Sequence, residues 1–166
     1  PNLAIAYVNL SGAVSANSEF EEAYQLLQKA LTIGKLSFGD QSREVAIIYG
    51  NLGTYYMTIG NYEESEKYHL KKKKMVQNIL GENNQSFADA LQGLAVIYTK
   101  SGEYRKSIKT LENAYEISVK LYGGNHFNQA DLLVLISNNY RSISEYEKSL
   151  EYLKKNKNLL ISKYGI

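Results

Sequence analysis

Apolar and polar positions along this chain repeat at a fixed interval. An aromatic residue followed by a polar, partly charged pair recurs every 42 residues, at Phe20, Tyr62, Tyr104 and Tyr146. An apolar residue followed by glycine recurs at the same interval, at Phe38-Gly39, Leu80-Gly81, Tyr122-Gly123 and Tyr164-Gly165. Self-similarity at a period of roughly 20 to 50 residues is typical of repeat architectures. The pattern therefore predicts four structural units.

Each unit reads as two helices joined by a short turn. Tyr49, Leu52 and Tyr56 are spaced by three and four residues, which places them on one stripe of a helix. The pair Gly60-Asn61 then favours a turn, because both residue types tolerate positive φ. The single proline is Pro1, so no proline breaks a later helix. We expect eight helices and no strand, at about residues 3–16, 20–37, 44–58, 62–80, 86–100, 104–122, 128–142 and 146–163.

These residues resemble a known family. The segment Tyr49-x-x-Leu52-Gly53-x-x-Tyr56 is similar to the first helix of a tetratricopeptide repeat, with Tyr49 where that family often has Trp. The 42-residue period and the polar loop 123–126 resemble the kinesin light chain type of this repeat, although no proline follows His126 as that type commonly has. The resemblance implies an all-α, tetratricopeptide-like α-solenoid of four helical hairpins in a right-handed superhelix, with a concave inner face.

The repeat extends over essentially the whole chain. We therefore expect a single repeat domain, residues 1–166, with units of about 1–42, 43–84, 85–127 and 128–166. The chain has no initiating Met and ends abruptly, so we expect a fragment of a longer protein. Residues 3–10 are apolar nearly all round, and we expect another hairpin or a partner to cover this first helix.

Composition argues against catalytic and metal-dependent classes. The chain has no Cys, and His69 and His126 are its two histidines, so neither a thiolate nor a common zinc spacing is available. It also lacks the motifs of hydrolases, nucleotide-binding loops and dinucleotide-binding folds. We expect no enzymatic activity and no cofactor or metal. No apolar run is long enough for a bilayer and no signal peptide is evident, so we expect a cytoplasmic protein without a membrane partner.

The candidate binding residues lie on the first helix of each hairpin, which should line the concave face. After the packing stripe is assigned, the groove is expected to contain Asn9, Asn51, Thr54, Gln92, Val96, Lys100, Asn138 and Arg141. Lys100 and Arg141 are the only cations expected near this stripe, so the column of charge-assisted donors that grips carboxylates is weak. Two interpretations of Asn9 and Asn51 stay open: each side chain satisfies helix backbone, or it contacts a ligand.

Two features of the second unit depart from the repeat. The run Lys71–Lys74 sweeps about 400° of a helix, so we expect ordinary solvated surface and no nucleic-acid site. Lys72 and His69 occupy columns that hold Ala30 and Leu27 in the first unit. We expect Lys72 to lay its methylenes along the interface and send its ammonium to water, and His69 to be a satisfied interface histidine. The alternative is a loosened joint or a pH-sensitive contact.

Together these patterns predict a protein–protein interaction module. The resemblance implies an adaptor that holds a peptide or protein partner in its groove, as part of a larger complex. The alternative is a structural scaffold in a large cytoskeletal or ciliary assembly, which would bind through its convex face or edges. The weak cationic column leaves both readings open.

Overall fold

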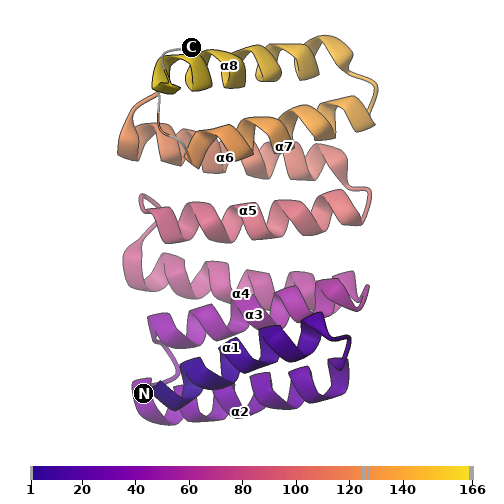
Figure 1. Ribbon diagram of the computed structural model, residues 1–166. Coiled ribbons are helices and arrows are strands. Elements are labelled where there is room, and N and C mark those ends of the chain that lie inside the picture. The colour runs from indigo at the N-terminus through magenta and orange to yellow at the C-terminus, as the bar shows by residue number, and fades with distance from the viewer. Residues whose placement is uncertain (1, 125, 127, 165–166) are drawn as a thin grey trace. The chain divides into compact units, whose positions relative to one another are not determined.

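Every regular element in the described part of the chain is an α-helix (Figure 1). The computed structural model describes residues 2–124, 126 and 128–164, which form eight α-helices and no strand. Each boundary lies within one residue of its prediction, so the all-α fold and the hairpin pattern are confirmed. The helices are α1 (Asn2–Ala16), α2 (Phe20–Phe38), α3 (Arg43–Thr58), α4 (Tyr62–Leu80), α5 (Gln85–Lys100), α6 (Tyr104–Tyr122), α7 (Asn128–Ser142) and α8 (Tyr146–Tyr164).

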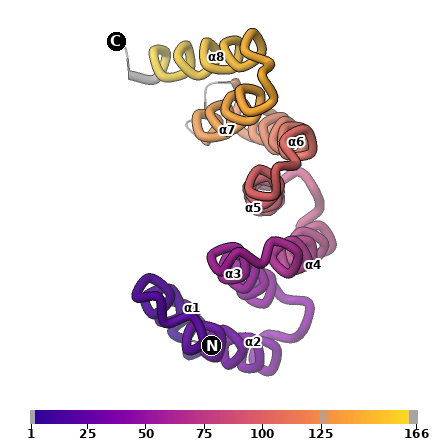
Figure 2. The backbone as a smooth tube through the Cα atoms, turned by 90° about the vertical axis from the view of Figure 1, so that its right-hand side faces the viewer, coloured from indigo at the N-terminus to yellow at the C-terminus, as the bar shows by residue number. Residues whose placement is uncertain are grey.

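The helices group into two compact units, Pro1–Ile79 and Leu80–Ile166. In the first unit α1 packs on α2, α2 packs on α3, and α1 also touches α3. In the second unit α5 packs on α6, α6 on α7, and α7 on α8 (Figure 2). Within each unit, the second helix of one hairpin thus packs against the first helix of the next, which is the packing expected of stacked hairpins.

Side-chain caps start the first helices of the two middle hairpins. The Ser42 hydroxyl accepts a hydrogen bond from the Val45 N–H at 3.3 Å, which caps α3. The Asn84 side-chain oxygen does the same for the Phe87 N–H at 3.0 Å, which caps α5. Each cap satisfies one of the backbone donors that a helix N-terminus leaves without an intrahelical partner.

The turn inside each hairpin needs a residue with positive φ. Gly60 and Gly102 adopt φ values of 79° and 80°. Ser18 and Ser144 stand in the same column of the repeat and adopt φ values of 66° and 61°. A non-glycine residue pays a steric cost in this region, so the turn geometry of the repeat imposes the conformation where glycine is absent.

A column of small residues lets the two helices of a hairpin approach closely. The Ser65 hydroxyl donates to the Gly53 carbonyl at 2.7 Å, which ties α4 to α3. The Ser107 hydroxyl donates to the Ala95 carbonyl at 2.8 Å, which ties α6 to α5. Ser65 and Ser107 are both fully buried, and these bonds satisfy their hydroxyls inside the core.

Candidate functional site

The exposed side of α1 and α3 forms the candidate binding surface of the first unit, and we call it the first-helix face. Its larger hollow has a volume of about 370 Å³. The lining is mostly apolar, with two charged residues from the start of α3, and consists of Ala4, Ile5, Val8, Asn9, Phe38, Arg43, Glu44, Ile47 and Ile48. Ile5 and Ile47 are each about half exposed, at 53% and 51%. The face therefore offers an apolar recess to a partner side chain.

A smaller recess of about 70 Å³ lies further along α1 and α3, where α2 also contributes to its lining. It is lined by Ser11, Gly12, Ser15, Ala23, Leu27, Asn51, Thr54, Tyr55 and Thr58. The structure thus places Asn9 in the larger hollow, and Asn51 and Thr54 in the smaller one. All three expected groove residues of the first unit lie on the first-helix face.

Hydrogen bonds within α3 engage two of these side chains. The Asn51 amide nitrogen donates to the Ile47 carbonyl at 3.0 Å. The Thr54 hydroxyl donates to the Gly50 carbonyl at 3.1 Å. For Asn51 the backbone interpretation accounts for the amide nitrogen, and a ligand would have to use the other side-chain atom or displace this bond.

The corresponding face of α5 and α7 in the second unit has a different chemistry. A hollow of about 250 Å³ is lined by Gln85, Ala88, Asp89, Gln92, Asn128, Asp131 and Leu132. Asp89 and Asp131 are exposed, and the Gln85 amide donates to Asp89 at 2.7 Å. These two carboxylates stand in the 42-residue column that holds Ile5 and Ile47 in the first unit. Sequence reasoning missed this column, although the repeat spacing made it readable.

The remaining expected groove residues lie along α5 and α7. Gln92 lines the α5–α7 hollow. Val96 is half-buried and Lys100 is exposed, both toward the C-terminal end of α5. Asn138 and Arg141 are exposed on α7. The structure therefore brings Gln92 next to Asp89 and Asp131 and places the two expected cations further along their helices.

Lys72 and His69 both pack against glycines of α3. A Cβ atom at Gly50 would lie 3.0 Å from Lys72 Cδ, so the lysine stem fills the space of the missing side chain. His69 is 5% exposed and lies against Gly53. Burial, followed by the positive charge of Lys72, lowers the pKa of His69 to about 4. Among the described residues His69 Nδ1 has no hydrogen-bond partner, so the expectation of a satisfied histidine was wrong.

The lysine run of α4 is divided between different environments. Lys71 Nζ lies 4.5 Å from the ring centroid of Tyr68 and 5.7 Å from that of Tyr49. Such cation–π contacts attract the ammonium to the ring face. Lys72 lies along Gly50, whereas Lys74 is exposed. The run does not form one basic stripe.

The described residues offer neither a metal site nor a membrane-spanning helix. No group of three or more His, Asp or Glu side chains in this part of the chain is arranged to hold a metal ion. Likewise, none of the described helices combines the length and the apolar character that crossing a membrane requires.

The chain matches a known repeat family over most of its length. The family model described as "Tetratricopeptide repeat" matches residues 2–85 and 86–155. A search of curated protein sequences finds no match.

Several solved structures share the fold. BtubC (BKLC) from P. vanneervenii has a TM-score of 0.87 at 19% identity, with 99% of this chain covering 65% of that one. A Podosopora anserina protein described as a kinesin light chain with nearly identical TPR-like repeats scores 0.82 at 16% identity, with 96% covering 75%. The signal transduction ATPase with numerous domains from Pyrococcus horikoshii, which has a tetratricopeptide repeat sensor, scores 0.77 at 22% identity, with 98% covering 24%. The kinesin light chain-like repeat predicted from the 42-residue period is confirmed at the level of the fold.

Proposed function

Because this chain belongs to the tetratricopeptide repeat family, we propose that it is a protein-interaction module that binds an extended segment of a partner protein on the first helices of its hairpins. Repeats of this family generally mediate protein–protein interaction, and their fold is a non-catalytic interaction fold. The proposed contact residues are Asn9, Asn51, Thr54, Gln92, Val96, Lys100, Asn138 and Arg141.

The apolar hollow of the first-helix face is the observation that carries this proposal. An opening of about 370 Å³ beside Asn9 is large enough for a bulky apolar side chain. The side chains of Asn9, Asn51 and Thr54 lie along the same face and can form polar contacts with the backbone of an extended segment. Apolar anchors in pockets and a few polar contacts together give an interface both affinity and direction.

A protein partner fits this surface better than a nucleic acid or a membrane does. Net charge is only +2, and of the α4 lysines Lys71 lies over a tyrosine ring and Lys72 lies along helix α3. Binding to nucleic acid or an anionic membrane rests on several cations that neutralise phosphates together. We propose in addition that the protein is an adaptor in a larger cytoplasmic complex.

A structural scaffold is the second candidate, and the exposed apolar faces of α1 and α8 favour it. Leu10 of α1 and Leu153 of α8 are 48% and 44% exposed. Large exposed apolar side chains on terminal helices are suited to fixed contacts in an assembly. The kinesin light chain-like fold makes a cytoskeletal or ciliary assembly the natural setting to test.

Site-specific photo-crosslinking distinguishes the two candidates. A photoreactive amino acid replaces Ile47 on the first-helix face, Leu153 on α8, or Leu36, an 83% exposed control on α2. In cell extract, an adaptor is expected to give a discrete crosslinked protein band from position 47 that the variant Asn51→Ala weakens, with no band from position 36. Crosslinks from position 153 alone would contradict groove binding and support the scaffold.

A further inference from the structure

The hollow between α5 and α7 carries two carboxylates, whereas the larger hollow of the first unit is mostly apolar. We propose that the α5–α7 hollow binds an arginine side chain from a basic segment of the partner protein, with Asp89 and Asp131 holding the guanidinium group. This inference rests on the function proposed above, because it assigns a partner chemistry to the first helices of the second unit.

The hollow lies inside the second unit, where α5 and α7 are on the same side of α6 (Figure 2). Its volume is about 250 Å³, and both first helices contribute to its lining. Asp89 comes from α5 and Asp131 from α7. Since α6 packs on both α5 and α7, one packed unit holds the two carboxylates on the same surface.

The carboxylates of Asp89 and Asp131 have no ion-pair partner within the described part of the chain. The two cations expected near the groove, Lys100 and Arg141, lie in the last turns of α5 and α7. At roughly 1.5 Å per residue, they stand about 15 Å further along these helices than the carboxylates. The hollow therefore keeps a negative charge that attracts a cation.

Helix stability alone does not account for this pair of carboxylates. Asp131 lies in the first turn of α7, where a negative charge offsets the helix dipole. Helix α5 has no acidic residue in its first turn, and Asp89 lies beyond that turn. The Gln85 amide donates to Oδ1 of Asp89, which leaves the second carboxylate oxygen and the negative charge for a ligand.

The hollow presents hydrogen-bond acceptors that lack donors. Asp89 and Asp131 are exposed, and an ionised carboxylate can only accept. Gln85 lines the same hollow, and its Oε1 is buried without a hydrogen-bond partner among the described residues. A buried acceptor without a donor carries a desolvation cost. The site therefore favours a ligand that brings positive charge together with several donors.

A guanidinium group meets both requirements. It carries a permanent positive charge and a planar fork of N–H donors, and it has no acceptor. One edge of the fork can bind a carboxylate in a bidentate manner, which leaves further N–H groups for a second acceptor. A metal ion fits less well, because the described residues contain no group of three or more acidic or histidine side chains arranged to hold one. An acidic partner segment would be repelled.

Nuclear magnetic resonance titration of the ¹⁵N-labelled chain tests the assignment. The probe is the peptide acetyl-Gly-Arg-Gly-amide, and the matched probe contains citrulline, which resembles arginine in shape but has no charge. At low salt, the arginine probe should shift the backbone amide signals of residues 85–92 and 128–132. The citrulline probe should bind at least about tenfold more weakly, because the two carboxylates attract the missing charge. Added sodium chloride should weaken the arginine probe.

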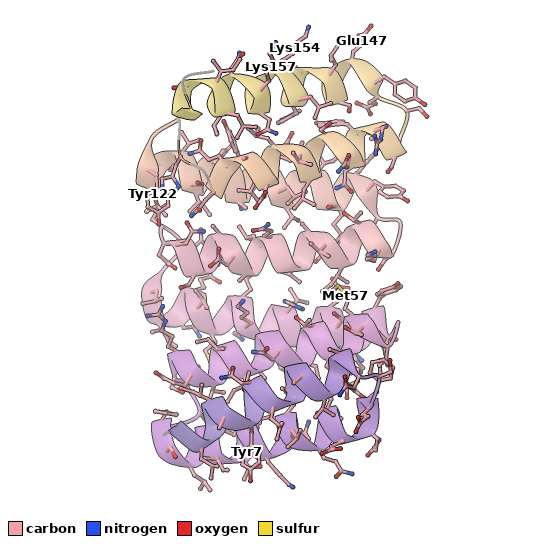
Figure 3. All side chains as sticks on the ribbon, viewed as in Figure 1. Tyr7, Met57, Tyr122, Glu147, Lys154 and Lys157 are labelled. Carbon is pink, nitrogen blue, oxygen red and sulfur yellow. The ribbon has the colours of Figure 1, made fainter. Side chains whose placement is uncertain are left out.

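Two double variants separate the hollow from the general charge of the protein. The variant with Asp89→Asn and Asp131→Asn should bind the arginine probe at least about tenfold more weakly than the parent. The control with Glu22→Gln and Glu147→Gln changes the net charge by the same amount and should bind like the parent. Both control residues are exposed and outside the lining of the hollow, and Glu147 projects from α8 on the side away from α7 (Figure 3).

Several results would overturn the proposal. The arginine site is wrong if the arginine probe shifts none of these amides, or if the citrulline probe or the asparagine variant binds with the parent affinity. It is also wrong if the glutamine control loses as much affinity, or if calcium chloride shifts the same amides and the arginine probe does not. The citrulline comparison uses only the parent chain, so it decides the question even if a variant loses helix by circular dichroism.

The titration can fail separately from the proposed function. Crosslinking at position 47 reports on the first unit, whereas the titration reports on α5 and α7. A crosslinked band from position 47 without a shift that depends on arginine would keep the interaction module and reject the arginine site. Shifts that depend on arginine without that band would support the arginine site and reject the apolar hollow as a contact.

Discussion

The imidazole of His69 occupies the space that a side chain at residue 53 would need, because residue 53 is glycine. A Cβ atom at Gly53 would overlap the ring, and Nε2 would lie only 2.6 Å from it. In the third hairpin the same two columns hold Ala95 and Leu111, which are both buried. Where the third hairpin has Ala95 and Leu111, the second hairpin therefore has Gly53 and the planar ring of His69.

This exchange predicts strong coupling between the two positions. Gly53→Ala alone should destabilise the protein by about 1 to 3 kcal/mol, because the added methyl group overpacks a filled contact. Adding His69→Leu recreates the Ala95–Leu111 pair and should recover much of that loss. Urea denaturation of the parent, both single variants and the double variant measures the coupling energy. If the effects of the two substitutions on the unfolding free energy are additive, positions 53 and 69 are not coupled and the prediction is wrong.

The buried histidine also predicts a loss of stability in mild acid. The folded pKa of His69 is about 4, below the ordinary value of 6.5, so the unfolded state binds a proton that the folded state does not. The contribution of neutral His69 to the free energy of unfolding is full above pH 6.5. It is lost as the pH falls from 6.5 toward 4, by up to about 1.4 kcal/mol per pH unit.

The variant His69→Leu isolates this effect. The difference in unfolding free energy between the parent and His69→Leu should change between pH 7 and pH 5, with the variant gaining relative stability at the lower pH. His126 remains in both proteins and cancels in the comparison. A pH-independent difference would show that His69 is already solvated or protonated in the folded state.

Glu112 of α6 joins the last two helices of the second unit. The hydroxyl groups of Tyr140 and Tyr152 both donate to its Oε1, at 3.1 and 2.7 Å, and the two rings stack with centroids 5.5 Å apart. Burial and then the Glu112 charge raise the pKa of Tyr140 to about 12, and burial together with the hydrogen bond to Glu112 raises that of Tyr152 as well.

Glu112→Gln should therefore lower both tyrosine pKa values, which an ultraviolet titration of phenolate absorbance measures. It should also cost about 1 kcal/mol of stability, because a charge-assisted acceptor becomes neutral. Since the folded pKa values lie above the ordinary value of 10, stability is full below pH 10 and falls as the pH rises toward 12. Glu116→Gln on the same helix is the control and should leave the titration unchanged.

Substituting alanine for Gly102 and for Gly12 should change the stability of the protein in opposite directions. Gly102 has a φ of 80°, so Gly102→Ala should destabilise the protein by about 1 to 2 kcal/mol. Gly12 lies inside α1, and an added Cβ would meet no atom within 4 Å. Gly12→Ala should therefore stabilise the protein by up to about 1 kcal/mol through helix propensity. Thermal unfolding followed by circular dichroism checks both signs, and a stabilising Gly102→Ala would refute the turn argument.

The helices and their pairing could be predicted from the sequence because local interactions encode them. Side chains spaced by three and four residues, the turn pair Gly60-Asn61 and a constant 42-residue interval determine where each helix begins and ends. The same columns identified Asn9, Asn51 and Thr54, which the structure places on one face of α1 and α3.

Only the tertiary structure decided how the spaces between helices are filled. From the sequence, His69 and Lys72 depart from the apolar and small residues of their repeat columns. In the structure each lies against a glycine of α3 that makes room for it. The apolar hollow around Ile47 also depends on side chains from helices that are distant in sequence. Periodicity specifies which side of a helix is buried, but packing at interior density depends on the combined volume of residues from several helices.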